Sequence, residues 1–306
     1  MKDIVSMKPY GERTPDEQYK RLLQEILDHG IKSKAQQEVD TITRIAPQPL
    51  RFRLDNGYPL ITERNIAPDF KKVPTIWRQA IGEIFAFING VRTQEGLEEF
   101  GTQWWKYWVT PEKCEKRGLE VGDLGPGSYG AAFHDFPTTE GESFNQFEAM
   151  IEQIKERPHL KTHFITPWIP QYTPRIEGRT QKVVVCPCHG WIHLRVFDSK
   201  LVLHMFQRSA DVPIGLPANM AQYAALTVAL AHVLNLEPYE YVHSFSDAHI
   251  YENQVDAVRE LLTRETRPFP TLLMNTDKKS IFDFRHTDFE IEDYNPHEGL
   301  KIPVAI

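Results

Sequence analysis

The segment from Pro217 to Leu236 places the tightest limit on how this chain can fold, because it is the most apolar long stretch of the sequence. Its small side chains let neighbouring backbone approach closely in a close-packed interior, and they are Ala218, Ala221, Ala224, Ala225, Ala229 and Ala231. Asn219, Gln222 and His232 interrupt the stretch, which argues against a membrane span. We therefore predict the central core helix here.

A second apolar segment, Pro74 to Asn89, carries a single carboxylate among its hydrophobic side chains. Its apolar face is so broad that the helix should be largely buried. A buried carboxylate is costly unless it is hydrogen-bonded or functional, because loss of water disfavours the charged form. Glu83 is therefore a candidate site residue.

Short runs of strand-forming residues surround these helices. Trp191 to Phe197 and Leu201 to Phe206 are joined by Asp198-Ser199-Lys200, which predicts a hairpin. Further strands are expected at Val183 to Val185, Tyr239 to Ser246 and Thr271 to Met274, with a helix at Tyr251 to Arg264. The fold class is α+β around a mixed sheet, and 306 residues are compatible with one principal domain.

Two local patterns predict element ends near the N-terminus. Thr14-Pro15-Asp16-Glu17 is typical of a helix start, and Gly30 should close that helix in the left-handed conformation. Leu50 to Leu54 and Tyr58 to Thr62 flank Asp55-Asn56-Gly57, which predicts a second hairpin with a tight turn.

Charge and cysteine content narrow the functional class. A formal charge of −7 and a pI near 6.0 provide no basic surplus for a nucleic-acid backbone. Three cysteines are too few for a disulfide framework and suit a reducing cytoplasm. Met1 to Tyr10 lacks the apolar core of a signal peptide. We expect a cytoplasmic protein that needs neither membrane nor nucleic acid.

The strongest chemical signal is Cys186-Pro187-Cys188-His189, followed one hairpin later by Gln207-Arg208-Ser209-Ala210-Asp211. A guanidinium near Cys188 would favour the thiolate, which is the nucleophilic form. From spacing alone, a small buried hydrophobic cysteine is the favoured alternative. A metal site is improbable, because these adjacent ligands lack the separated second pair that zinc sites use.

The region from Cys188 to Tyr251 resembles the signature region of thymidylate synthases in order and spacing. The matching pieces are Cys188-His189, Gln207-Arg208-Ser209, Asp211, Gly215-Leu216-Pro217, Asn219 and Asp247-Ala248-His249-Ile250-Tyr251. Similarity covers about residues 17 to 306. It implies a thymidylate synthase-like domain over 1–306, with an extension at 1–16 and insertions near 112–120 and 172–180. It also implies a homodimer that pairs through its sheets.

The resemblance implies a reaction in which the Cys188 thiolate adds to C6 of a uracil nucleotide and methylenetetrahydrofolate donates a one-carbon unit to C5. The catalytic residues implied are Cys188, Glu83, Tyr129, Asp211 and Arg208. Substrate contacts are implied for Arg208, Ser209, Asn219, His189, His249, Tyr251 and Lys161. Folate contacts are implied for Trp105, Trp108, Asp211, Gly215 and Ala305.

Several of these residues also have simpler interpretations. Asn219 could match the N3–H and O4 of uracil with one amide, or it could cap its helix. Tyr129 could be a packed loop tyrosine, while His249 and Tyr251 could be satisfied core polar residues. Trp105 and Trp108 could be core aromatics.

The sequence departs from the family at the nucleotide phosphate. Of four expected arginines only Arg208 is plain, because the early loop at 32–38 has none and the pair expected from the partner subunit is Lys161-Thr162. Lysine is a weaker point-charge substitute for a bidentate clamp. Arg175, Arg179 or Arg44 could supply new contacts, and Ala218 replaces a usual phenylalanine.

These departures leave three functions open. The first is thymidylate synthase-type methylation, which the retained Trp105 and the tail at 303–306 favour, because that tail excludes water in the family. The second is nucleotide 5-hydroxymethylation, in which water replaces hydride. The third is an inactive nucleotide- or folate-binding relative, against which the retained Cys188, Glu83 and Asn219 argue. The sugar, the phosphate state and the role of Cys186 stay open.

Overall fold

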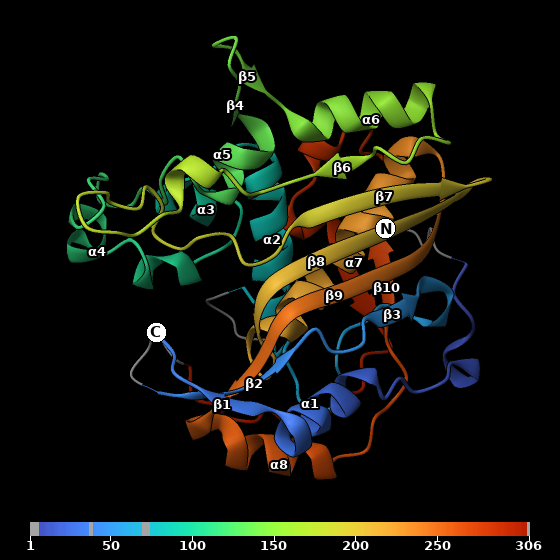
Figure 1. Ribbon diagram of the computed structural model, residues 1–306. Coiled ribbons are helices and arrows are strands. Elements are labelled where there is room, and N and C mark those ends of the chain that lie inside the picture. Colours follow the sequence, from blue (N-terminus) through green and yellow to red (C-terminus); the bar gives the residue numbers. More distant parts are fainter. Residues whose placement is uncertain (1–5, 37–38, 69–73, 305–306) are drawn as a thin grey trace.

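The computed structural model describes residues 6–36, 39–68 and 74–304, and a mixed β-sheet lies at its centre (Figure 1). The strand order is β1-β2-β9-β8-β7-β6, with β3 beside β9. The two longest strands, β8 (Lys200–Asp211) and β9 (Glu237–Tyr251), run parallel, and the other pairs of this sheet are antiparallel. The remaining strands are β1 (Ile31–Ser33), β2 (Thr41–Ile45), β3 (Leu50–Arg53), β6 (Phe164–Ile165) and β7 (Trp191–Phe197). The predicted α+β class with a mixed sheet is confirmed.

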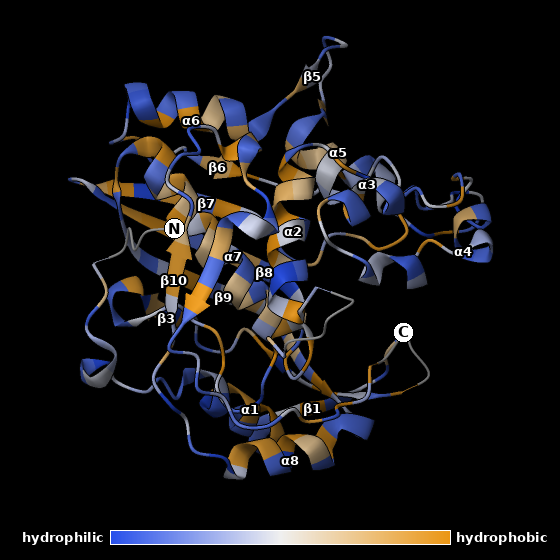
Figure 2. Ribbon diagram, turned by 180° about the vertical axis from the view of Figure 1, so that it is seen from behind, coloured by the Kyte–Doolittle hydropathy of each residue, from blue (hydrophilic) through white to orange (hydrophobic). Residues whose placement is uncertain are grey.

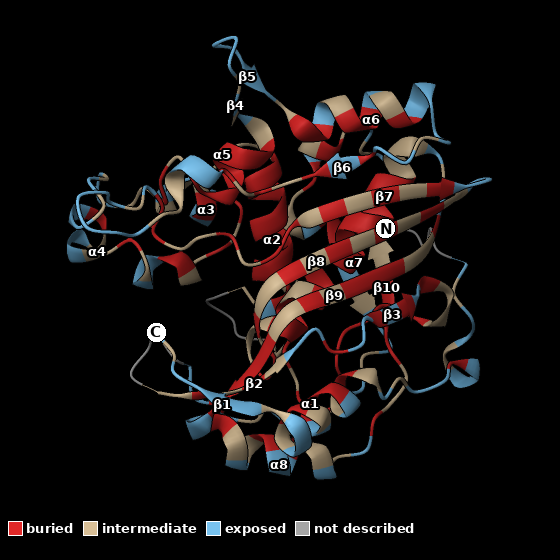
Figure 3. Ribbon diagram, viewed as in Figure 1, coloured by how far each residue is buried: buried red, intermediate tan, exposed pale blue. Residues whose placement is uncertain are grey.

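Helices α7 (Gly215–Leu234) and α2 (Ile76–Ile88) form the layer behind the sheet. Helix α7 packs against β8 and β9 on one side and against α2 on the other. Both helices are largely buried (Figure 3), and the view from behind shows that many of their residues are hydrophobic (Figure 2). Ala221, Ala224 and Ala225 have no exposed surface. The prediction of a central alanine-rich core helix is confirmed.

The other helices cover the margins of this core. Helices α1 and α8 lie beside β1 and β2, α6 lies beside β6, and α3, α4 and α5 gather beyond α2 (Figure 1). Their bounds are α1 (Gln18–His29), α3 (Gln94–Glu99), α4 (Pro111–Glu115), α5 (Tyr129–His134), α6 (Gln146–Glu156) and α8 (Val255–Thr263). Two small sheets pair β4 (Phe136–Pro137) with β5 (Ser143–Phe144) and β10 (Thr271–Met274) with β11 (Phe289–Glu292).

The predicted hairpin at residues 50–62 is wrong. Strand β3 pairs with β9, and Leu54–Asn56 forms a 3-10 turn before Gly57, whose φ is 113°. Residues 58–62 form no strand and are buried without alternation. Tyr58 donates its hydroxyl to the Ala221 carbonyl of α7 at 2.7 Å. This segment is therefore apolar because it lies against the core helix, not because it pairs with β3.

The first helix ends at Gly30 as predicted, but its start and the conformation of that glycine differ from the prediction. Helix α1 begins at Gln18, whose backbone N–H is accepted by the Asp16 carboxylate at 2.9 Å, so Asp16 caps a start that was assigned to Thr14. Gly30 has φ −72°, which is not left-handed. A Cβ at Gly30 would lie 2.4 Å from the Ile26 carbonyl oxygen and 2.6 Å from a methyl of Ile42. Glycine is needed there for close packing between α1 and β2.

The remaining differences concern strand limits near the predicted chemistry. Val183 to Val185 is irregular, and Val184 donates its N–H to the Leu124 carbonyl at 3.0 Å. The hairpin of β7 and β8 is confirmed, but β8 continues to Asp211 and β9 to Tyr251, so the following helix starts only at Val255. The extensions carry polar residues, among them Gln207, Arg208 and Asp247, which the sequence pattern did not indicate as strand.

Candidate active site

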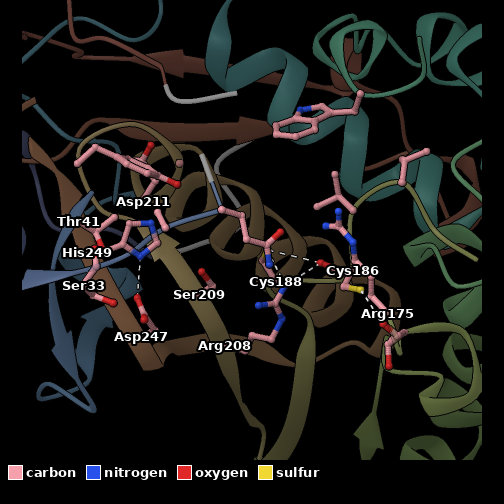
Figure 4. A pocket seen from close by; sticks show the side chains of 18 of the residues that line it. Ser33, Thr41, Arg175, Cys186, Cys188, Arg208, Ser209, Asp211, Asp247 and His249 are labelled. Carbon is pink, nitrogen blue, oxygen red and sulfur yellow. Dashed lines mark hydrogen bonds and ion pairs between the residues drawn. The ribbon is translucent and has the colours of Figure 1, made fainter. Parts of the chain in front are cut away.

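A cavity of about 720 Å³ opens where β8 and β9 end (Figure 4). Parallel neighbours bring their carboxyl ends to the same edge of the sheet, and here Ser209 is aligned with Asp247 and Asp211 with His249. The residues that line the cavity from strands are Ser33, Thr41, Arg208, Ser209, Asp211, Asp247, His249 and Tyr251. Loops contribute Trp108, Trp168, Arg175, Cys186, Cys188 and Val304, among others.

The sulfur of Cys188 belongs to this cavity and lies beside a guanidinium. Arg208 Nη2 lies 3.4 Å from Cys188 Sγ. The same guanidinium donates to the carbonyls of Pro187 and Cys186, at 3.0 Å each, and its Cζ lies 5.8 Å from the Trp168 ring. Three further contacts thus hold Arg208 in place, and the predicted pairing of thiol and arginine is present in the structure.

Two opposing effects act on this thiol. Burial raises the pKa of Cys188, and the Arg208 guanidinium opposes that rise. The positive charge stabilises the thiolate that a nucleophilic attack requires. Cys188 is nevertheless only partly covered in the structure, so its sulfur can be reached from the cavity.

Tyr129 supports the backbone of the nucleophile from behind the cavity. Its hydroxyl accepts the N–H of Cys188 at 2.7 Å and that of His189 at 3.4 Å. Its ring stacks between Phe87 and His189, with centroids 4.7 and 4.6 Å away. Burial raises the pKa of Tyr129 well above its ordinary value, so the phenol is neutral. The proton-transfer role implied by the family stays a prediction.

His189, implied as a substrate contact, is buried and does not line the cavity. Its Nδ1 lies 2.7 Å from the Tyr223 hydroxyl. Burial lowers the pKa of His189 to about 3, so the imidazole is neutral at physiological pH. In this structure His189 contacts the buried Tyr129 and Tyr223 behind Cys188.

Glu83 is buried on α2 and fully engaged by hydrogen-bond donors. One carboxylate oxygen accepts the indole N–H groups of Trp104 and Trp105, both at 2.6 Å, and the other accepts Gln222 Nε2 at 2.9 Å. Burial raises the pKa of Glu83, and these three donors oppose the rise. The expectation that a lone carboxylate on this helix must be hydrogen-bonded or functional is consistent with these contacts.

Asn219 belongs to a chain of amides that ends at Glu83. Gln207 Nε2 donates to Asn219 Oδ1, and Asn219 Nδ2 donates to Gln222 Oε1, each at 3.2 Å. Gln207 Oε1 in turn lies 2.9 Å from Nε2 of the buried His243. Each amide fixes the orientation of the next, so the donor and acceptor of Asn219 point in set directions. The sequence-based prediction missed Gln222 and His243, because neither residue belongs to a local motif.

The carboxylate of Asp211 sits at the start of α7. It accepts the N–H of Ile214 at 3.2 Å and Gln254 Nε2 at 3.3 and 3.4 Å. Burial raises the pKa of Asp211, and the nearby His249 opposes the rise. Gln254 also donates to the Pro303 carbonyl at 2.9 Å, which ties the C-terminal tail to the cavity. Val304 lines the cavity, and the implied folate contact Ala305 lies outside the described residues.

Of the remaining residues implied as substrate or folate contacts, some line the cavity and others do not. His249 and Tyr251 line the cavity, and His249 Nδ1 lies 2.7 Å from the Asp247 carboxylate. Trp108 and Gly215 also line it. Trp105 instead is buried beside Glu83, outside the cavity lining.

The residues considered as contacts for the nucleotide phosphate lie in different parts of the structure. Ser209 and Lys34 line the cavity, and so does Arg175. Arg44 is engaged by Glu25 at 2.7 Å, and Arg179 lines an adjoining groove. Lys161 is exposed and outside the cavity lining, and Gln37 and Glu38 of the early loop lie outside the described residues.

Trp168 and Arg117 are among the lining residues that the sequence-based prediction missed. Arg117 lies within the expected insertion at 112–120, so its departure from the family pattern was the available signal. Trp168 carries no local motif, and only the fold brings it to Arg208.

Comparison with protein families gives one match over most of the chain. Among the described residues, no helix combines the length and apolar content needed to cross a bilayer. The same residues contain no group of three or more His, Cys, Asp or Glu side chains able to hold a metal ion. The family model described as thymidylate synthase matches residues 17–306.

Proposed function

The chain belongs to the thymidylate synthase family, and we propose that it methylates C5 of a uracil nucleotide, with methylenetetrahydrofolate as the one-carbon donor. Family membership makes it an enzyme of folate-dependent transfer to pyrimidine C5 or of a related transfer. One observation carries the proposal for this chain: Cys188 Sγ faces the cavity 3.4 Å from the Arg208 guanidinium.

Cys188 acts as the covalent nucleophile. Its thiolate forms an S–C6 bond, and the electron pair of the C5=C6 double bond makes C5 nucleophilic. Once C5 carries the one-carbon unit and has lost its proton, the bond from that carbon to the folate nitrogen must break and a hydride or a water must add to the carbon. The S–C6 bond then breaks, the thiolate leaves and the C5=C6 double bond returns. Arg208 assists the first step by favouring the thiolate, and Tyr129 supports the backbone N–H of Cys188 at 2.7 Å.

Glu83 serves the proton transfers at O4 of the base. Its raised pKa brings a buried carboxyl closer to the range in which it can both give and take a proton. The two indole donors and Gln222 hold it without a neutralising cation, since none of its hydrogen-bond partners is charged.

Asn219 selects uracil. A planar amide matches N3–H with its oxygen and O4 with its nitrogen, whereas cytosine presents the opposite pattern. Gln207 and Gln222 orient this amide from both sides at 3.2 Å. His249 and Tyr251 of β9 line the cavity, and they contact the sugar hydroxyls of the bound nucleotide in this proposal.

The cavity has groups suited to the folate. Trp108 offers an aromatic face, and Asp211 offers a carboxylate for ring N–H groups. Gly215 has no side chain to cover its backbone at the cavity wall, and Val304 of the C-terminal tail lines the same cavity. When bound, the folate supplies the one-carbon unit and, in methylation, the reducing hydride.

Adduct trapping tests the proposal directly. Incubation with 5-fluoro-dUMP and methylenetetrahydrofolate should add both masses to the peptide that contains Cys188, because fluorine at C5 cannot leave as a proton does. A panel of dUMP, UMP, dCMP and CMP then identifies the preferred substrate. If no uracil nucleotide forms an adduct, the protein is a binding relative and not an enzyme of this type.

A second candidate is 5-hydroxymethylation, in which water adds to the exocyclic methylene. The burial of Trp105 away from the cavity lining favours it, because that ring then does not exclude water from the methylene. The mass of the product separates the two, since methylation adds CH2 and hydroxymethylation adds CH2O. Dihydrofolate should accumulate, as measured by absorbance, only in methylation.

We also propose a homodimer that pairs through its sheets, as the family resemblance implies, within the cytoplasm. Lys161 would then act on the nucleotide of the partner subunit, which agrees with its exposure outside its own cavity. Sedimentation of the purified chain tests the dimer.

A further inference from the structure

Two arginines from separate insertions face the same end of the cavity. Arg117 follows α4, and Arg175 belongs to the loop between β6 and β7. Both line the cavity that contains Cys188. Figure 4 shows Arg175 beside Cys186 at one end, whereas His249, Asp247 and Ser33 lie at the other.

These guanidiniums are available to an anion. Among the described residues, no carboxylate lies within ion-pair distance of Arg117 or Arg175. Arg117 is held in place by the carbonyls of Val183 and Lys113, at 3.0 and 2.6 Å, so its position does not depend on a ligand. Burial and then the charge of Arg175 lower the pKa of Arg117. A bound anion would relieve that repulsion.

A basic groove of about 450 Å³ continues outward from this pair. It shares Arg117, Arg175 and Gln181 with the cavity. Its other basic residues are Lys113, Lys116 and Arg179, and none of its lining residues is acidic. Lys113 Nζ lies 4.6 Å from the Trp108 ring, so the groove begins at the aromatic wall of the cavity. Such a concentration of positive charge is unusual in a chain of net charge −7.

From this arrangement we propose that Arg117 and Arg175 form a second oxyanion site, separate from Arg208, which binds the anionic tail of a substrate. The guanidinium of Arg208 is already engaged by Pro187, Cys186 and Cys188, so it cannot extend to this groove. Guanidinium pairs bind carboxylate and phosphate oxygens through planar, charge-assisted hydrogen bonds. Lys116 is paired with Glu112 at 2.7 Å, whereas no ion pair is found for Lys113 or Arg179 among the described residues, so these two cations beyond the pair suit a tail with more than one anionic group.

The inference rests on the proposed function, because both substrates of that reaction carry oxyanions. The folate ends in glutamyl carboxylates, and additional glutamates lengthen that chain. The nucleotide carries phosphate, which di- and triphosphates lengthen. The position of the groove, next to Trp108 and opposite His249, favours the folate tail. The chemistry at the guanidiniums is the same for both sources.

Arg175→Gln tests the site, because Arg175 is exposed and the substitution should leave the fold intact. Steady-state KM is measured with mono- and pentaglutamyl methylenetetrahydrofolate, and separately with dUMP, dUDP and dUTP. We expect on the order of a tenfold rise in KM for the polyanionic form of one substrate and a smaller rise for its shortest form. The series that responds identifies the tail. Arg175→Lys should recover part of the affinity.

Arg259→Gln is the matched control, since Arg259 is an exposed arginine of α8 outside the cavity lining. Equal KM values for all ligands in Arg175→Gln and the parent would overturn the site. A uniform rise that Arg259→Gln reproduces would overturn it too, because it would reflect general charge attraction. Adduct formation on Cys188 with 5-fluoro-dUMP is scored in each variant. Its loss in the parent would reject the proposed function itself, independently of this site.

Discussion

The residues around the nucleophile and those at the rim of the cavity are positioned in different ways. What we call the nucleophile end comprises Cys188 and Arg208, which line the cavity, and Glu83 and Asn219, which lie outside its lining and are both hydrogen-bonded to Gln222. The rim comprises residues 33–36, Arg117 and Arg175, and it lies on the end of β1 and on loops. A rigid core positions chemistry, whereas loops change without disturbing it. This difference supports our proposal that the chain keeps the reaction of its family and alters what holds the charged ends of the substrates.

The largest expected effect is that of Cys188→Ala at the nucleophile end. Without the sulfur no S–C6 bond can form, so turnover should fall by roughly 10⁴-fold or more. Product formation and the fluoro-nucleotide adduct are measured together. Cys186→Ala is the control, because Cys186 lines the same cavity but receives no bond from Arg208 at its sulfur. Equal losses in both variants would show that Cys188 has no special role.

Glu83→Gln should come next, with kcat reduced on the order of 10²- to 10⁴-fold, as expected for the loss of a general acid/base. The amide can still accept the indole N–H groups of Trp104 and Trp105, so the fold should survive. Glu63→Gln is the matched control. Glu63 is also buried with a raised pKa, but its carboxylate accepts from Thr62 and Thr266 and has no bond to the amide chain of Asn219. A comparable loss of kcat in Glu63→Gln would make the Glu83 effect one of packing.

The same division explains what the sequence could predict. Cys188, Arg208 and Asn219 occur in local motifs, and the apolar helices around Glu83 set its burial, so the sequence predicts them as parts of one site. In the structure Arg208 contacts Cys188, and Gln222 links Asn219 to Glu83. The bond from Trp105 to Glu83 depends on how a 3-10 turn at 104–107 meets α2, which no local pattern encodes. The failed hairpin at 50–62 has the same cause, since its apolar residues pack on α7.

Asn219→Asp tests the base selection made by the amide chain. A carboxylate can accept from Gln207 as before, but it no longer offers a donor to O4 of uracil. The ratio of kcat/KM for dUMP to that for dCMP should fall by about 10²-fold, because the hydrogen-bonding pattern then favours cytosine. Competition assays with both nucleotides measure the ratio. An unchanged ratio would mean that Asn219 caps the helix and does not read the base.

Arg208→Gln should shift the pH dependence of the thiol. Burial raises the pKa of Cys188, and the guanidinium opposes that rise. Removing the positive charge leaves burial unopposed, so the pKa should rise further and less thiolate should be present at any pH below it. Each unit of increase lowers the thiolate fraction about tenfold. Iodoacetamide alkylation of the free enzyme between pH 6 and 10 measures it, and a midpoint that moves downward contradicts the assignment.

The smallest effect is expected at the rim, from Lys34→Gln. Lys34 lines the cavity, but its side chain is 95% exposed and lies 3.9 Å from Asp40. An exposed lysine is a strongly hydrated point charge, and such contacts contribute about 1 kcal/mol or less. The KM for dUMP should therefore rise only about two- to fivefold, and 0.5 M salt should remove the difference by screening. Lys32→Gln is the control, because Lys32 pairs with Glu252 outside the cavity lining. A loss of tenfold or more that persists in salt would place Lys34 in a rigid clamp, and the rim would then share the construction of the nucleophile end.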